Sequence, residues 1–269
     1  MRKPLLLAAA IAATLAFAGP ASAEPTWAPA ASAPIHPGVQ TITEGGQCTA
    51  NFVFFDGANN VLIGQAAHCS STGGSTETDG CDSGSQPLGT PVEVEGASKP
   101  GTMVYNSWLT MQANGESDPD TCAYNDLALV KLDPADYGKV NPSIPFWGGP
   151  TGITDTVAQG EKVLSYGNSS LRLGITQLSP KEGLSLGQTG NGWSHEVYTV
   201  TPGIPGDSGS AFINRDGKAF GVLSTLQIAP KVGANGVGDL SRELAYANAN
   251  GAGVTLANGT EAFRGPLLP

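Results

Sequence analysis

The sequence predicts an all-β protein. Only 13% of its 269 residues are charged, whereas glycine and proline are numerous, with 37 and 20 copies. Such a composition is typical of short strands joined by tight turns. Short apolar runs rich in β-branched and aromatic residues recur between the turn residues, as strands do. A chain of this length can form one β domain or two small barrels, because length alone does not decide the number of domains.

Residues 1–23 have the pattern of a secretory signal peptide. They open with two basic residues, continue with an apolar stretch that is short for a membrane span, and end in the small-residue cleavage motif Ala-Ser-Ala. An uncleaved anchor is the alternative, which Pro20 and the small residues disfavour. We therefore expect a secreted, extracellular protein with no membrane contact after the signal is removed.

Two stretches of unusual composition divide the remaining chain. Residues 24–39 are rich in Pro and Ala and show no periodicity, which predicts a flexible N-terminal arm or a short pro-segment. Residues 141–150 contain three prolines and two glycines, the composition of a linker. We expect this linker to separate an N-terminal β region at 40–140 from a C-terminal one at 151–269.

The first half contains a clear hairpin. Residues 50–55 and 60–66 are apolar, strand-like runs, and the Asp-Gly-Ala-Asn turn at 56–59 joins them. Residues 92–95 alternate polar and apolar side chains and predict an edge strand, and residues 127–132 predict a further strand.

The second half repeats this pattern and ends in a helix. Strands are predicted at 162–166, 196–201, 211–214 and 219–225. Residues 215–218, Arg-Asp-Gly-Lys, form a hairpin turn between the last two. Residues 239–248 begin with an N-cap candidate, Asp239, and place Leu240 and Leu244 on one face, which predicts a short terminal helix.

The four cysteines predict two disulfides, because an even number of cysteines in a secreted protein is usually paired. Three pairings are possible. We favour Cys48 with Cys69, because these residues lie at the two ends of the hairpin, which leaves Cys81 with Cys122. Free buried thiols are the less common alternative outside the cell.

The chain carries three short motifs, which are AAHC at 66–69, NDLALV at 125–130 and GDSGS at 206–210. A serine hydroxyl is a weak nucleophile and needs a base within hydrogen-bond reach, and the base needs a carboxylate that fixes its tautomer. Each motif alone has an ordinary structural interpretation, as a buried histidine, a strand-entry cap or a surface turn. Together they favour a catalytic triad of His68, Asp126 and Ser208, in that chain order.

In these motifs and their order the chain resembles the chymotrypsin-like serine proteases, particularly the secreted bacterial branch. The resemblance covers most of the chain after about Gln47. It implies two antiparallel six-stranded β-barrels with the active site in the cleft between them. It also implies a serine endopeptidase that works through an acyl-enzyme, with His68 as base, Asp126 as orienting carboxylate and Ser208 as nucleophile. The backbone N–H groups of Gly206 and Ser208 match the oxyanion-hole donors of that family.

The chain departs from this family at two points. Ser210 stands where the family usually has glycine, and the Ile-Val-Gly-Gly activation sequence of the mammalian enzymes is absent. In those enzymes a freed N-terminus pairs with the aspartate before the nucleophile, so a buried Asp207 would need another cation. Some bacterial relatives use an internal arginine, and Arg172 is the candidate here. The alternative is that Arg172 is simply exposed.

The resemblance also locates a primary specificity pocket, which binds the P1 side chain on the N-terminal side of the cleaved bond. Pro202 falls at its base, Ser224 lies on its wall strand, and Leu226 stands where an open pocket has glycine. No carboxylate lies between Pro202 and Gly206 to pair with a basic P1 residue. We expect small or medium apolar P1 residues.

The net charge of the chain and the spacing of its potential metal ligands argue against nucleic-acid binding and against a metal site. A net charge of −10 argues against nucleic acid or an anionic surface as partner. The three histidines, His36, His68 and His195, are scattered, and with paired cysteines no metal-ligand spacing remains. We therefore expect no cofactor and no metal, a protein or peptide substrate, and a monomer. Two other functions remain open: a protease-like binding module with little turnover, and an esterase that uses the same triad.

Overall fold

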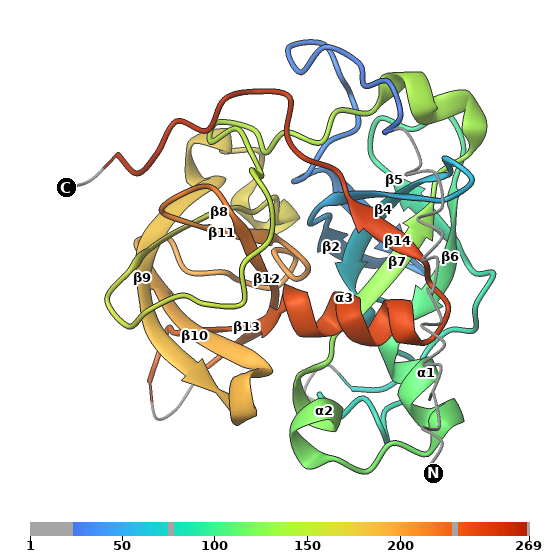
Figure 1. Ribbon diagram of the computed structural model, residues 1–269, viewed down its shortest axis with the longest axis vertical. Coiled ribbons are helices and arrows are strands. Elements are labelled where there is room, and N and C mark those ends of the chain that lie inside the picture. Colours follow the sequence, from blue (N-terminus) through green and yellow to red (C-terminus); the bar gives the residue numbers. More distant parts are fainter. Residues whose placement is uncertain (1–23, 75–77, 228–230, 268–269) are drawn as a thin grey trace, which may run out of the picture.

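The computed structural model describes residues 24–74, 78–227 and 231–267. They form two antiparallel β structures side by side, joined by helix α3 (Leu240–Ala249) (Figure 1). The predicted signal peptide, residues 1–23, lies outside the described residues. Among the helices that are described, none is long and apolar enough to span a bilayer.

The first β structure is an eight-stranded sheet in the order β14-β3-β4-β7-β6-β5-β1-β2. Its strands are β1 (Gln40–Thr43), β2 (Gly46–Thr49), β3 (Val53–Asp56), β4 (Val61–Ala66), β5 (Pro91–Val94), β6 (Gly101–Asn106), β7 (Leu127–Lys131) and β14 (Val254–Leu256). The predicted hairpin is β3–β4, in which Val53 faces Ile63. Strand β14 comes from near the C-terminal end of the chain and pairs with β3, so it forms one edge of the first sheet.

The second β structure is a closed six-stranded barrel in the order β10-β13-β12-β11-β8-β9. Its strands are β8 (Lys162–Tyr166), β9 (Pro180–Thr189), β10 (Ser194–Thr199), β11 (Ala211–Asn214), β12 (Ala219–Leu226) and β13 (Asn235–Asp239). The all-β prediction is therefore confirmed, and four of these six strands were expected from the sequence. The second half is the expected six-stranded barrel, whereas the first half is one eight-stranded antiparallel sheet, because β1 and β2 and the late strand β14 add to it.

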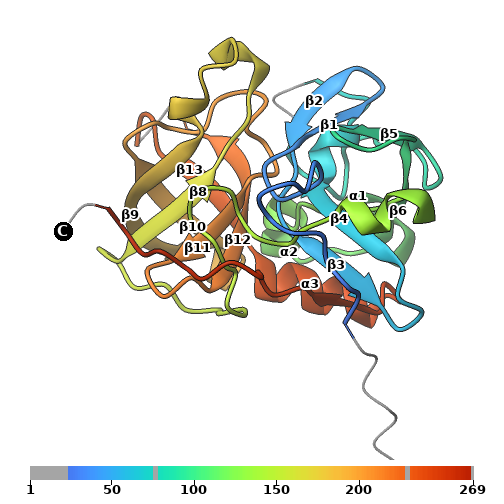
Figure 2. The ribbon, with the colours of Figure 1, turned by 90° about the horizontal axis from the view of Figure 1, so that it is seen from above.

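Helices are short and lie beside the sheets. They are α1 (Ser107–Asn114), α2 (Pro119–Tyr124) and α3, with 3₁₀ turns at Ala67–Ser70, Pro134–Lys139, Ser170–Arg172, Thr176–Leu178 and Gly190–Gly192. Asp239 caps α3 by accepting from the N–H of Arg242, as the predicted N-cap should. The predicted terminal helix is confirmed. Two views show α3 leaving the barrel after β13 and running along the first sheet (Figure 1, Figure 2).

One hydrophobic cluster holds the two β structures together. It contains Phe54 and Leu127 from the first sheet, Ile213 from the barrel, and Leu240 and Leu244 from α3, all buried. A shared core of this kind fixes the position of one half relative to the other, because close-packed interiors resist sliding. The two halves are therefore held in a fixed position relative to each other.

The segment expected to be a flexible arm is packed over much of its length. Ile35 is buried and bridges Val140, and Val39 is buried in the core of the first sheet. The Ala28 N–H also donates to the Val140 carbonyl at 2.9 Å. The expectation of a flexible 24–39 is wrong for this part, because its few apolar side chains find a place against the first sheet.

Candidate active site

His68 and Asp126 come together at the ends of two paired strands. His68 lies in the 3₁₀ turn that follows β4, and Asp126 immediately precedes β7. Because β4 and β7 are antiparallel, with Ala66 facing Leu127, the end of one strand lies beside the start of the other. His68 Nδ1 lies 2.7 Å from Asp126 Oδ2, and the His68 N–H donates to Oδ1 at 2.9 Å. The carboxylate thus holds both the ring and the main chain of the histidine.

A third donor reaches this carboxylate from the barrel. The Ser224 hydroxyl on β12 donates to Asp126 Oδ2 at 2.6 Å. Asp126 is buried, while the His68 side chain keeps 24% of its surface exposed. With Nδ1 facing Asp126, Nε2 is the ring nitrogen that is available to a nucleophile.

Asp126 also sets the basicity of the ring. Burial by itself lowers the pKa of His68, but the negative charge of Asp126 and its hydrogen bond to the ring outweigh burial and raise the pKa above 6.5. The imidazolium is therefore stabilised at this position, as a base that must accept a proton requires.

The GDSGS loop is held from the first sheet. The Ser208 carbonyl accepts from the Thr49 N–H at 2.8 Å, and the Gly206 carbonyl accepts from Gln47 Nε2 at 2.9 Å and Thr49 Oγ1 at 2.8 Å. Gly206 has a φ of +94°, a conformation that favours glycine. A Cβ at Gly209 would lie 2.5 Å from the Thr49 carbonyl, so glycine is needed for this close approach.

Ser208 itself is half-buried at the tip of this loop. Among the hydrogen bonds of the described residues, none uses the backbone N–H of Gly206 or of Ser208. Within the described part of the molecule, these two donors therefore have no protein acceptor.

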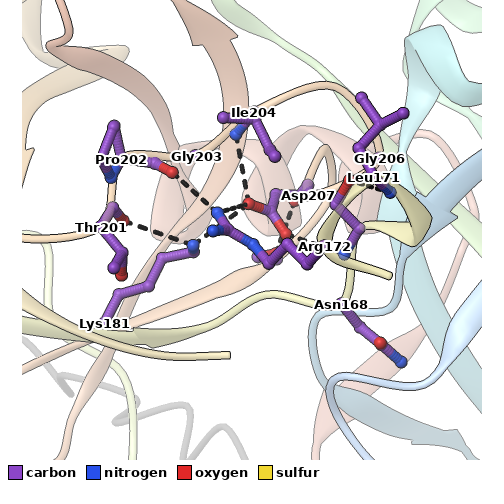
Figure 3. Close-up of polar contacts among 12 residues, drawn as sticks. Asn168, Leu171, Arg172, Lys181, Thr201, Pro202, Gly203, Ile204, Gly206 and Asp207 are labelled. Carbon is purple, nitrogen blue, oxygen red and sulfur yellow. Dashed lines mark hydrogen bonds and ion pairs between the residues drawn. The ribbon is translucent and has the colours of Figure 1, made fainter. Parts of the chain in front are cut away.

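Asp207 is fully buried and paired with two cations (Figure 3). Its Oδ2 lies 2.7 Å from Arg172 Nη2 and 3.1 Å from Lys181 Nζ. The carboxylate also accepts from the N–H groups of Ser169 at 3.0 Å and Ile204 at 3.1 Å. The structure thus places Arg172 where the sequence predicted the partner of Asp207, and it adds a second cation.

Lys181 was missed by the sequence, where it stands in an ordinary polar run, Ser-Pro-Lys-Glu. It lies on β9 with no exposed surface, and its ammonium also donates to the Thr201 carbonyl at 3.3 Å. Burial lowers the pKa of Lys181. The negative charge of Asp207 raises this pKa, and the positive charge of Arg172 lowers it. The loop before Ser208 is therefore supported by a strand that lies far from it in sequence.

The three residues predicted for the specificity pocket have different surroundings. The Pro202 carbonyl accepts from Arg172 Nη2 at 2.9 Å, so the loop at this point is tied to the Asp207 cluster. The Ser224 hydroxyl is engaged by Asp126. Leu226 is 41% exposed at the end of β12.

A residue that the sequence did not reveal bridges these two walls. The Asn235 carboxamide accepts from the Gly203 N–H at 2.8 Å and donates to the carbonyls of Gly203 and Thr225, each at 3.1 Å. Asn235 is buried at the start of β13. The loop before Ser208 and strand β12 are thus separated here by the width of one carboxamide group.

A surface cavity of about 280 Å³ adjoins Ser224. Tyr124 of α2 lines one side, and Glu196, Thr225 and Gln227 of the barrel line the other. The cavity lies between the two halves and beside the His68–Asp126 pair, which bonds to the same Ser224.

Both predicted disulfides are present, Cys48–Cys69 and Cys81–Cys122. Cys69 follows His68 directly, so its disulfide fastens the histidine turn to β2. The two groupings of potential metal ligands in the described chain each contain both sulfurs of one disulfide. Such sulfurs are not thiolates and do not ligate a metal.

Neither a protein-family model nor a curated protein matches this sequence. Solved structures match its fold. Protease A of Thermobifida fusca aligns with 84% of this chain and 99% of its own, at a TM-score of 0.54 and 18% identity. A Nocardiopsis protease aligns with 82% of this chain and 98% of its own, at 0.53 and 17%.

A glutamic acid specific serine protease, which uses a histidine triad in substrate binding, aligns with 83% of this chain and 100% of its own. Its TM-score is 0.53 at 16% identity. At these identities the likeness concerns the fold. The chain has the fold of the chymotrypsin-like bacterial serine proteases.

Proposed function

We propose that this protein is a secreted serine endopeptidase whose nucleophile is Ser208, whose base is His68 and whose orienting carboxylate is Asp126. The 2.7 Å pair between His68 and Asp126 carries this proposal, because it occurs in a protease-like fold beside an exposed face of the ring. The GDSGS loop supplies the serine.

In this proposal His68 Nε2 takes the proton of Ser208 as Oγ attacks the peptide carbonyl. The new oxyanion is bound by the N–H groups of Gly206 and Ser208. His68 then gives the proton to the leaving amine, and a water molecule repeats the sequence to release the acyl group. Asp126 stabilises the imidazolium in both halves of the reaction.

The loop geometry supports the oxyanion role. The buried Asp207 cluster holds the backbone just before Ser208, and Gln47 and Thr49 hold the Gly206 carbonyl from the other side. Preorganised donors of this kind avoid reorganisation during the reaction, which is why they accelerate it.

The substrate class follows from the specificity pocket. Asn235 spans the space between Gly203 and Thr225. The loop from Pro202 to Gly206 carries no carboxylate of its own, and the nearby Asp207 is already paired with Arg172 and Lys181. A basic P1 side chain would lack a counter-charge there, and a large ring would lack room. Small or medium apolar P1 residues fit best, with Leu226 at the entrance. The cavity beside Ser224 can take residues further toward the substrate N-terminus.

Secretion is supported by the two disulfides, since such bonds persist in oxidising compartments. The partner is a protein or peptide substrate, and the enzyme acts as a monomer.

A peptide library tests the proposed function. The secreted protein should cleave internal peptide bonds, Ser208→Ala should abolish cleavage, and Ser170→Ala, a change at an exposed serine in a nearby turn, should leave it intact. Hydrolysis of esters without peptides would show an esterase, and folded protein that cleaves neither would show a binding module. Either result would contradict the endopeptidase.

A further inference from the structure

Glu243 is a buried acid that contacts the main chain of Asp126. It lies on α3 with no exposed surface, and its Oε1 accepts from the Asp126 backbone N–H at 2.9 Å. The two residues are 117 positions apart in sequence. Helix α3 thus contacts the main chain of the residue whose carboxylate orients His68.

A side-chain acceptor also holds the residue that follows Asp126. At the entry to β7 the next N–H, that of Leu127, also donates to a side chain, the Ser107 hydroxyl, at 3.2 Å. The Asn125 carbonyl accepts from the same hydroxyl at 2.8 Å. Side chains therefore hold the main chain on both sides of Asp126, and Glu243 supplies the acceptor at Asp126 itself.

The surroundings of Glu243 favour its uncharged form. Burial raises the pKa of Glu243 well above the ordinary range of a glutamate. The hydrogen bond from the Asp126 N–H lowers this pKa, whereas the negative charges of Asp126 and Asp239 raise it. The Tyr105 phenol of β6 is buried as well; burial raises its pKa, and a charged Glu243 would raise it further. Asp239 in turn pairs with His195 at 2.8 Å. A neutral acid here accepts a hydrogen bond without placing a second negative charge behind Asp126.

Space for this carboxyl group is made by a glycine. A Cβ at Gly238 would lie 2.3 Å from Glu243 Oε1. Strand β13 therefore leaves room for the side chain to reach Asp126.

We propose that Glu243 is a positioning residue, which holds the main chain of Asp126 while His68 and Ser224 bond its carboxylate. This inference rests on the proposed proteolytic function. Docking of α3 then fixes the orientation of the base through Asp126.

Two substitutions of similar size separate this role from simple packing. Glu243→Gln keeps an oxygen acceptor for the Asp126 N–H, whereas Glu243→Leu removes it. In the Leu variant kcat should fall about 10- to 100-fold, as expected for a buried donor left without a partner, with KM little changed. In the Gln variant kcat should stay within about threefold of wild type. Asn248→Ala, near the C-terminal end of the same helix, removes side-chain hydrogen bonds to Val254 of β14; it should lower thermal stability and leave kcat near wild type.

An NMR titration of His68 provides a readout that does not need activity. The pKa of His68 should fall in the Leu variant, where Asp126 is held less well, and stay at the wild-type value in the Gln variant. A folded Leu variant with unchanged kcat and unchanged His68 titration would overturn the positioning role. If the wild type cleaves no peptide, the proposed function fails, and the titration still decides whether Glu243 positions Asp126.

Discussion

Ser224 on the barrel donates its hydroxyl to Asp126 on the first sheet at 2.6 Å. The carboxylate that orients His68 is therefore held by both halves of the molecule, while Glu243 of α3 holds the backbone N–H of the same aspartate. The base can keep its geometry only while the two halves stay docked. The shared hydrophobic core that contains Leu127 and Leu240 supplies that docking.

Removal of the Ser224 hydroxyl should slow the proposed reaction without preventing substrate binding. In Ser224→Ala we expect kcat to fall about 10-fold, because a hydrogen bond to a buried charge is lost, with KM nearly unchanged. Steady-state kinetics on a peptide substrate checks this. Ser170→Ala is the matched control. A fall in kcat/KM that arises entirely from KM would show that Ser224 serves the pocket rather than Asp126.

The pH dependence of activity should follow His68. Only the neutral ring accepts the Ser208 proton, and the pKa of the ring is raised above 6.5, so kcat/KM should rise with pH and level off above that value. Asp126→Asn removes the charge that raises the pKa. In this variant kcat/KM should rise at lower pH than in the wild type, while kcat falls by about 10⁴-fold. An unchanged pH dependence would mean that Asp126 does not set the basicity of His68.

Arg172 and Lys181, the two cations beside Asp207, should contribute unequally to the free energy of unfolding. Arg172→Met removes bonds to both Asp207 and the Pro202 carbonyl, whereas Lys181→Met removes a buried ammonium whose pKa burial already lowers. We expect Arg172→Met to reduce the free energy of unfolding more. The double variant leaves a buried carboxylate without a cation, which costs about 3–5 kcal/mol, more than the two single losses together. Chemical denaturation measures all three, and simple additivity would argue against a shared role.

Asn235 should limit the P1 side chain. Asn235→Ala removes the carboxamide between Gly203 and Thr225, so kcat/KM for Leu or Phe at P1 should rise relative to Ala by about 10-fold. Leu226→Gly should shift the ratio in the same direction. The ratio is measured with matched peptides, which cancels any general loss of stability. If both variants leave it unchanged, the pocket lies elsewhere.

The disulfides should differ in what they control. Cys48–Cys69 closes 21 residues and Cys81–Cys122 closes 41, so chain entropy predicts losses of about 3 and about 4 kcal/mol when each pair is changed to Ala. Activity should instead fall more when Cys48–Cys69 is removed than when Cys81–Cys122 is removed, because Cys69 adjoins His68. Unfolding and kinetics on the two double variants decide this. Equal loss of activity would contradict a local role for the first disulfide.

The sequence predicted those features that rest on local signals. Strands β8 and β11 begin and end at the predicted residues, because each is a short apolar run between turns. The His68 and Asp126 motifs are brought together, and both disulfides pair as expected.

The missed elements depend on distant partners. Strands β9 and β13 are rich in glycine and polar residues, and they become strands because they pair within the barrel. Lys181, Asn235 and Glu243 are polar residues whose burial comes from segments far along the chain. Helix α2 did have a local signal, since Asp118 caps it and Pro119 opens it.

The central claim is that Ser208 is the nucleophile, and mapping of a fluorophosphonate adduct tests it most directly. The protein is treated with the reagent, digested and analysed by mass spectrometry, beside His68→Ala and Ser170→Ala. The account predicts one adduct, on Ser208, which is lost in His68→Ala and kept in Ser170→Ala. An adduct on another residue, or no adduct in protein that cleaves peptides, would contradict it.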